Sequence, residues 1–300
     1  MDTLQLGRAT IDSIVELEVA FEPEWLLTEG ATADVLREFD AYGPRLIDPT
    51  TGGLKLTIQS YLLRTPRQTI LIDTCCGNER ERPSVPFFHR LDTDYLERLS
   101  ALVRPDSVDI VLCSHLHVDH VGWNVTQDGE RFVPTFPNAT YLFSAPEYHW
   151  WRDLHARGAG SPQAKAAFLE CVEPLVRSGQ ARLVEPDHCL EDSDDVDARL
   201  VELPGHTMHQ VGVSMGAGGR RVLFCADAVH HAIQFVHPTW RSRPDSDPAL
   251  GEKTARALIE TYADTDTIIL TSHSPHPNAC HLVRDGDAAR LLFVGETPPL

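Results

Sequence analysis

The sequence has little positive charge and no segment that would hold the chain at a membrane. Its 300 residues carry 26 Lys and Arg against 44 Asp and Glu, which gives a formal net charge of −18. Such acidity disfavours nucleic acid and anionic membranes as partners. No apolar run approaches the roughly 20 residues that span a bilayer. The opening residues lack the basic and apolar regions of a secretion signal.

Cysteine is sparse and scattered. The seven Cys are an odd number, and only Cys75 and Cys76 are adjacent. This is not the disulfide framework of a small secreted domain, so the reducing cytoplasm is the expected location. The sequence also lacks a Gly-x-Ser-x-Gly elbow, so it indicates no serine nucleophile.

The pattern of apolar residues predicts a mixed α/β protein, and no long linker divides it, so residues 1–300 are expected to form a single domain. A strand hairpin is predicted at 54–63 and 69–73, and a second at 211–213 and 221–225. Further strands are expected at 110–113, 200–203 and 267–271. Helices are expected at 91–103, with Asp92 or Thr93 as the cap, and at 145–157, 163–177 and 251–262.

A cluster of metal-binding side chains follows the strand at 110–113. His115 and His117 are two residues apart, so an extended backbone points both to one side. Asp119 and His120 come next, where the chain turns, and can reach a second point nearby. Imidazole and carboxylate are the usual protein ligands of zinc-like metals. The sequence therefore predicts a metal site, and a polar loop with surface histidines is the alternative.

The pattern His-x-His-x-Asp-His resembles the metallo-β-lactamase superfamily of hydrolases. The resemblance implies three later ligands, and the chain has them in order as His206 after Pro204-Gly205, Asp227 after an apolar strand, and His273 after another. It also implies the fold, an α/β protein of the αββα sandwich type. In that fold two mixed β-sheets lie face to face with helices outside and the metal site at one edge.

The same resemblance implies how the ligands are shared between two metals. The first would be held by His115, His117 and His206, the second by Asp119, His120 and His273, and Asp227 would bridge them. Two zinc ions per chain are expected, with iron, manganese and cobalt as alternatives. Zinc lowers the pKa of bound water to about 7, which supplies a bridging hydroxide as nucleophile. Asp119 is a candidate proton shuttle.

The segment from Asp227 to Phe235 resembles the corresponding stretch of methyl parathion hydrolase and related lactonases. Lactonases of acyl-homoserine lactones often carry a Tyr three residues after this Asp, where it contacts the substrate oxyanion. Here that position is His230, which can also donate a hydrogen bond and is therefore a catalytic candidate. The alternative is that His230 only supports a metal ligand.

The expected function is hydrolysis of a lactone or similar ester by a dinuclear metal centre. An organophosphate triesterase and a glyoxalase II-like thioesterase are alternatives, because relatives of both kinds keep the same ligands. A β-lactamase is a weaker candidate, and a catalytically silent metal-binding protein represents a different class of function. Monomer and homodimer are both open.

Aromatic residues near the ligands predict a small-molecule substrate that is uncharged and partly apolar. They are Phe87, Phe88, Trp123, Phe235 and Trp240. The alternative is that most of these rings belong to the core.

Asp73-Thr74-Cys75 stands where the family commonly has Asp-x-Gly. Because Cys75 occupies the glycine position, the backbone there is expected not to need a positive φ. Asp73 is expected either to orient a ligand histidine or to cap the loop. Cys75 and Cys76 are expected to be small buried residues.

Overall fold

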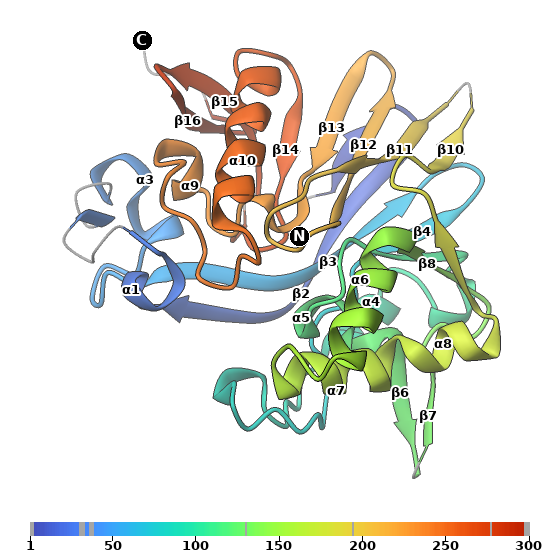
Figure 1. Ribbon diagram of the computed structural model, residues 1–300. Helices are drawn as coiled ribbons and strands as arrows, with labels where there is room; N and C mark the ends of the chain where they lie inside the picture. Colours follow the sequence, from blue (N-terminus) through green and yellow to red (C-terminus); the bar gives the residue numbers. More distant parts are fainter. Residues whose placement is uncertain are drawn as a thin grey trace. The chain divides into compact units, whose positions relative to one another are not determined.

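A computed structural model describes residues 3–29, 34–35, 39–129, 131–193, 195–276 and 278–296. The chain forms two compact units. Unit 1 comprises Met1–Leu17, Ile58–His188 and Asp194–Val196, and unit 2 comprises Glu18–Thr57, Cys189–Ser193 and Asp197–Leu300. Two mixed sheets of seven strands each, together with helices, confirm the predicted α/β class (Figure 1). Within the described residues, no helix has the length and apolar character needed to cross a membrane.

The first sheet has the strand order β1-β2-β3-β4-β5-β8-β9. Its strands are β1 (Leu4–Leu6), β2 (Ala9–Phe21), β3 (Leu54–Arg64), β4 (Thr69–Ile72), β5 (Ile110–Cys113), β8 (Thr140–Ser144) and β9 (Ala181–Val184). Strands β4, β5, β8 and β9 run parallel, and the pairs β1–β2 and β3–β4 are antiparallel. The sheet belongs to unit 1, except for the last residues of β2 and the first of β3.

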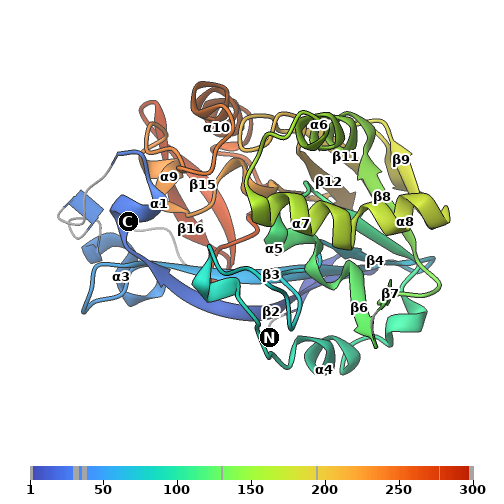
Figure 2. The ribbon, with the colours of Figure 1, turned by 60° about the horizontal axis from the view of Figure 1, so that its bottom comes forward.

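Helices connect and flank the parallel strands of unit 1. Between β8 and β9 the chain forms α6 (Ala145–Ala156), α7 (Pro162–Cys171) and α8 (Glu173–Ser178), which gather beside these strands (Figure 2). Each of them carries a proline in its first turn, where no N–H is needed. The shorter elements are η1 (Pro86–Phe88), α4 (Tyr95–Ser100), η2 (Pro105–Ser107), α5 (Val118–Val121), η3 (Gly122–Asn124) and the hairpin of β6 (Val125–Asp128) and β7 (Arg131–Pro134).

The second sheet lies in unit 2 and keeps its strands in chain order from β10 to β16. They are β10 (Cys189–Asp192), β11 (Asp197–Glu202), β12 (Val211–Ala217), β13 (Arg220–Phe224), β14 (Ile268–Leu270), β15 (Ala279–Asp285) and β16 (Ala288–Phe293). In the described part of this sheet, β13 and β14 pair in parallel and the other neighbours are antiparallel. They are joined through η4 (Ala226–Ala228), α9 (Ile233–Val236) and α10 (Pro248–Tyr262), and the N-terminal part of the unit adds α1 (Pro23–Leu26) and α3 (Phe39–Leu46).

Helix α10 shows why this sequence folds as an amphipathic helix. Asp247 caps it by accepting a hydrogen bond from Leu250 N at 2.9 Å, and Pro248 begins its first turn. The buried residues recur at helical spacing and form one stripe. They are Gly251, Thr254, Ala255, Leu258 and Ile259. The helix itself lies beside β15 and β16 (Figure 1).

Most predicted elements are confirmed, with two differences in the helices. The helix expected at 91–103 is shorter, Tyr95–Ser100, and Asp94 rather than Asp92 or Thr93 precedes it. The helix expected at 163–177 is two helices, α7 and α8, because Val172 leaves the helical conformation at φ −120°. Pro174 follows two residues later and has no N–H to continue the helical hydrogen bonds.

The loop after β4 corrects one prediction. Cys75 has a φ of 49°, so the expectation that this position needs no positive φ is wrong; Asp73 has a φ of 59° as well. A residue other than glycine keeps a positive φ when the surrounding structure holds its backbone in place. Here Gly122 N donates to Cys75 O at 2.7 Å, and Cys76 N donates to Glu16 Oε2 at 2.7 Å. Burial raises the pKa of Glu16, and the hydrogen bond from Cys76 N opposes part of that rise.

The same loop packs directly on the end of α5. A Cβ atom placed on Gly122 would lie 1.8 Å from the carbonyl oxygen of Cys76, although the φ of Gly122 is an ordinary −61°. Glycine is therefore required here by the close approach of two backbones and not by its conformational freedom. Cys75 and Cys76 are both buried free thiols, as predicted.

The replacement Gly122→Ala should lower the free energy of unfolding by about 3 kcal/mol or more, since two backbone segments must separate. Urea denaturation measures this loss. Gly216→Ala is the matched control, because its nearest neighbour would be a side-chain atom of Arg221 at 3.6 Å. Equal losses in the two variants would contradict the close-packing argument.

Candidate metal centre

Unit 1 contains the first four predicted ligands in one short segment that follows β5 and runs into α5. His115 Nε2 lies 3.1 Å from His117 Nδ1, and Asp119 Oδ2 lies 3.7 Å from His120 Nε2. Tetrahedral zinc with bonds of 2.0–2.1 Å places neighbouring donor atoms about 3.3 Å apart. The two pairs therefore have the spacing of atoms that share a metal.

Asp73 fixes the two buried imidazoles of this segment. Its carboxylate accepts hydrogen bonds from Ser114 N at 2.7 Å, Ser114 Oγ at 2.8 Å and His120 Nδ1 at 2.9 Å. Because a carboxylate only accepts, His120 carries its hydrogen on Nδ1 and keeps a lone pair on Nε2. Ser114 gives its hydrogen to Asp73, so its oxygen accepts from His115 Nδ1 at 3.1 Å. Asp73 thus both orients the ring of His120, a predicted ligand, and holds the loop.

Unit 2 gathers two later predicted ligands, His206 and His273, together with His230 around one carboxylate oxygen of Asp227. Asp227 Oδ2 lies 3.1 Å from His273 Nε2, 3.5 Å from His206 Nε2 and 3.1 Å from His230 Nε2. All four side chains are buried. Asp227 follows β13 within η4, and His273 follows β14, so two neighbouring parallel strands deliver them.

Hydrogen-bond acceptors also fix two of these imidazoles. His206 Nδ1 donates to Asp245 Oδ1 at 3.1 Å, and His273 Nδ1 donates to the carbonyl oxygen of Thr57 at 2.9 Å. Each ring therefore directs a lone pair on Nε2 toward Asp227. Asp245 is held in turn by Arg241, whose guanidinium lies 2.9 Å away. Burial raises the pKa of Asp245, and the charge of Arg241 opposes that shift.

The donor chemistry fits a divalent metal. Within unit 2, one ligand atom each of Asp227, His230 and His273 lie within 4.8 Å of one another, as do those of His206, His230 and Asp245. Imidazole nitrogen and carboxylate oxygen suit zinc and its neighbours in the first transition series. The predicted ligands thus form two groups, four residues in unit 1 and three in unit 2.

Neither Asp245 nor Arg241 could be predicted from the sequence. They lie 39 and 35 residues after His206, in a stretch without metal-ligand spacing. Only the folded chain brings Asp245 to the far side of the His206 ring. The one signal available was a general rule, that a ligand histidine uses its other nitrogen to bind an acceptor.

Several predicted pocket residues belong to the core instead. Phe88 and Trp123 are buried in the core of unit 1, and Phe235 is fully buried in that of unit 2. Phe87 packs against the same core as Phe88. Trp123 also donates to Glu16 Oε1 at 2.6 Å, which is a structural contact. These rings therefore have packing roles, and their burial gives no support to the expected apolar substrate wall.

The neighbouring histidines have structural contacts. His231 is buried, and its Nε2 donates to the carbonyl oxygen of Leu46 at 2.9 Å while its Nδ1 accepts from Ile233 N. Burial lowers the pKa of His231 to about 4, so the ring is neutral. His237 stacks on Trp240 at 3.9 Å between ring centroids.

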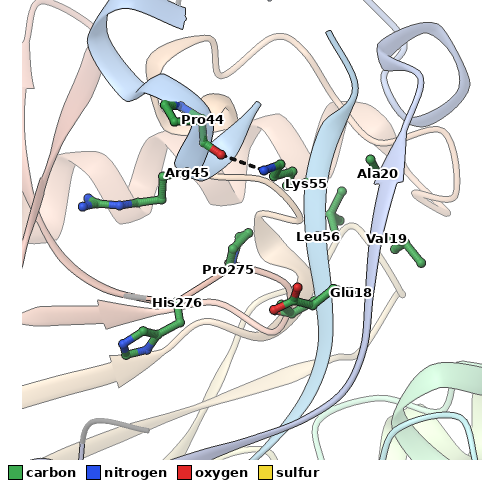
Figure 3. Close-up of a pocket in the computed structure, with 10 residues that line it drawn as sticks. Glu18, Val19, Ala20, Pro44, Arg45, Lys55, Leu56, Pro275 and His276 are labelled. Carbon is green, nitrogen blue, oxygen red and sulfur yellow. Dashed lines mark hydrogen bonds between the residues drawn. The ribbon is translucent and has the colours of Figure 1, made fainter. Parts of the chain in front are cut away.

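A separate hollow of about 410 Å³ lies on unit 2 (Figure 3). Residues of β2, α3, β3 and the segment after His273 line it, and Lys55 Nζ donates to the carbonyl oxygen of Pro44 at 2.8 Å. Its charged residues include Glu18, Arg45 and Lys55. None of the seven predicted ligands is among its lining residues.

The comparison with protein families decides the class of this chain. The model of the metallo-beta-lactamase superfamily matches residues 55–273, well over half of the sequence. The chain belongs to the metallo-β-lactamase superfamily. The match includes all seven predicted ligands and, with the two mixed sheets, confirms the predicted fold class.

Solved structures share this metallo-β-lactamase fold over almost the whole chain. A hydrolase of the β-lactamase superfamily, AbOPH, has 21% identity and a TM-score of 0.78, with 98% of this chain and 97% of that chain covered. AidC, a dizinc quorum-quenching lactonase, has 19% identity and a TM-score of 0.76, with 99% and 98% covered. A probable metal-dependent hydrolase from Staphylococcus aureus has 14% identity and a TM-score of 0.70, with 98% and 100% covered. At these identities the likeness shows the fold alone.

The replacement Asp73→Asn should weaken metal binding by about 10-fold to 100-fold, because the His120 ring loses the acceptor that fixes it. Asparagine tolerates the positive φ at this position, so the loop should survive. Competition with a chelating dye measures the affinity. The control is Asp109→Asn, since Asp109 accepts from Thr69 N at 2.8 Å on the exposed side of the sheet. Unchanged affinity in Asp73→Asn would refute the orienting role.

Proposed function

We propose that the protein is a dinuclear zinc-dependent hydrolase that opens lactones or similar esters. The observation that carries this proposal is the arrangement around Asp227, where His206 and His273 each direct a lone-pair nitrogen at the same carboxylate oxygen. A carboxylate placed between two such nitrogens is suited to bridge two metals. The membership of the superfamily supplies the reaction class.

The seven ligands would divide as the family resemblance implies. His115, His117 and His206 would hold one ion, Asp119, His120 and His273 the other, and Asp227 would be shared. When bound, the metals would lower the pKa of water to about 7 and polarise the substrate carbonyl. Iron, manganese or cobalt can take the place of zinc with the same donors.

Asp119 is the residue that would move the proton. Its side chain is 16% exposed, whereas that of its neighbour His120 is 2% exposed. In ester hydrolysis water adds across the carbonyl carbon–oxygen bond, and the departing alkoxide needs a proton. A carboxylate at the edge of the site can take the proton released by the attacking water and give it to that oxygen.

His230 would stabilise the negative charge that develops on the carbonyl oxygen. Its ring lies beside the His206 ring, at 4.4 Å between centroids, and its Nε2 is directed at Asp227. A hydrogen-bond donor placed where charge develops lowers the barrier more than one that binds the ground state.

The choice of a lactone rests on resemblance. The segment Asp227 to Phe235 resembles that of lactonases, and the structurally similar AidC is named as a dizinc lactonase. The same metal centre could also hydrolyse a phosphotriester or a thioester, so both substrates remain alternatives. We propose a small uncharged substrate, although the buried rings of Phe88, Trp123 and Phe235 no longer support its apolar character.

The charge of −18 and seven free thiols support a cytoplasmic protein without nucleic-acid or membrane partners.

The zinc-loaded protein should open at least one member of a lactone panel, and Asp119→Asn should reduce kcat by about 100-fold or more. A pH-indicator assay follows the acid released. Turnover of phosphotriesters or thioesters without any lactone would select one of the alternatives. Equal rates for wild type and Asp119→Asn would point to a contaminating enzyme and to a silent metal-binding protein.

A further inference from the structure

His230 is held differently from the other imidazoles around Asp227. His206 and His273 each bind an acceptor through Nδ1, a carboxylate and a carbonyl oxygen. The Nδ1 of His230 instead faces a hydroxyl, Ser242 Oγ, at 2.7 Å. A hydroxyl can donate or accept, so the neighbours of Ser242 decide which nitrogen of His230 carries the hydrogen.

Gln234 has a fixed amide orientation beside this hydroxyl. Its Oε1 accepts from the backbone N–H groups of His230 at 2.8 Å and His231 at 3.0 Å. Its Nε2 is therefore on the opposite side, where it donates to the carbonyl oxygen of Trp240 at 2.7 Å and to Ser242 Oγ at 3.3 Å. Both hydrogens of the amide are used.

The direction of the Ser242 hydrogen bond follows. Among the described residues, the partners of this fully buried hydroxyl are Gln234 Nε2, which only donates, and His230 Nδ1. A buried hydroxyl hydrogen needs an acceptor, so Ser242 donates to His230 Nδ1. In the neutral ring the hydrogen then lies on Nε2, the atom that is 3.1 Å from Asp227 Oδ2.

We infer that Ser242 and Gln234 are positioning residues that hold His230 with a hydrogen on Nε2. His230 is therefore a hydrogen-bond donor at the reaction centre and not an eighth metal ligand, although its position alone would allow ligation. The same carboxylate, Asp227, is thus approached by two lone-pair nitrogens and one N–H group. The catalytic role of His230 rests on the proposed function. The assignment of its tautomer rests on the hydrogen bonds alone.

Nitrogen-15 spectra of the labelled, zinc-loaded protein test the tautomer directly. The Nδ1 and Nε2 shifts of His230 should show the Nε2–H form, whereas His120, His206 and His273 should show Nδ1–H forms. The variant His230→Gln identifies the signals of His230 by their loss. An Nδ1–H form of His230 with a metal-shifted Nε2 would overturn the inference and make this residue a ligand.

Variants test the positioning role. Ser242→Ala should shift the His230 signals away from the pure Nε2–H form and lower kcat by about 10-fold with little change in KM, because only transition-state stabilisation is lost. Ser242→Thr keeps the hydroxyl and should restore both. Ser178→Ala is the matched control, since that hydroxyl donates to the carbonyl oxygen of Leu175 in unit 1. An unchanged tautomer in folded Ser242→Ala would contradict the role of Ser242.

The tautomer of His230 and the proposed lactone substrate are tested separately by these experiments. If the wild type shows Nε2–H at His230 but opens no lactone, the proposed substrate is wrong and the tautomer assignment stands. If lactones are opened while His230 shows Nδ1–H, the function stands and the assignment to Ser242 and Gln234 is wrong. Should Ser242→Ala not fold, the wild-type spectrum still decides.

Discussion

The candidate metal centre depends on one kind of interaction. In it, the Nδ1 of an imidazole donates a hydrogen bond to an acceptor on the side of the ring away from the metal site. Asp73 provides it for His120, Asp245 for His206 and the backbone of Thr57 for His273. Each bond fixes the ring and leaves the Nε2 lone pair facing inward, which is the form that binds a metal. The acceptors are buried, so they are held by further contacts of their own, such as Arg241 on Asp245.

Those acceptors explain the local structure around the ligands. Asp73 has a positive φ, and its carboxylate accepts hydrogen bonds from Ser114 N, Ser114 Oγ and His120 Nδ1. The loop after it packs on Gly122 at the end of the helix that carries His120. The strain of this loop is compensated by hydrogen bonds to buried groups, which include Glu16. The fold therefore stabilises the loop as part of the support for the ligands.

The sequence was informative where the chemistry is local in the chain. The cluster from His115 to His120 and the later His206, Asp227 and His273 could be predicted from their types and order, as could the family. Asp245, Ser242 and Gln234 could not, because an Asp, a Ser or a Gln in a loop has no periodicity that marks its partner. The φ of Cys75 was missed for a related reason, since distant contacts and not residue type impose it.

The number of metal ions that the chain needs for activity tests the proposed dinuclear centre most directly. Metal-free protein should be titrated with zinc while bound metal is measured by elemental analysis and ester hydrolysis by rate. Activity is expected to rise and to level off at about two equivalents of zinc per chain. Full activity at one bound equivalent, with no second ion taken up, would contradict the shared role of Asp227.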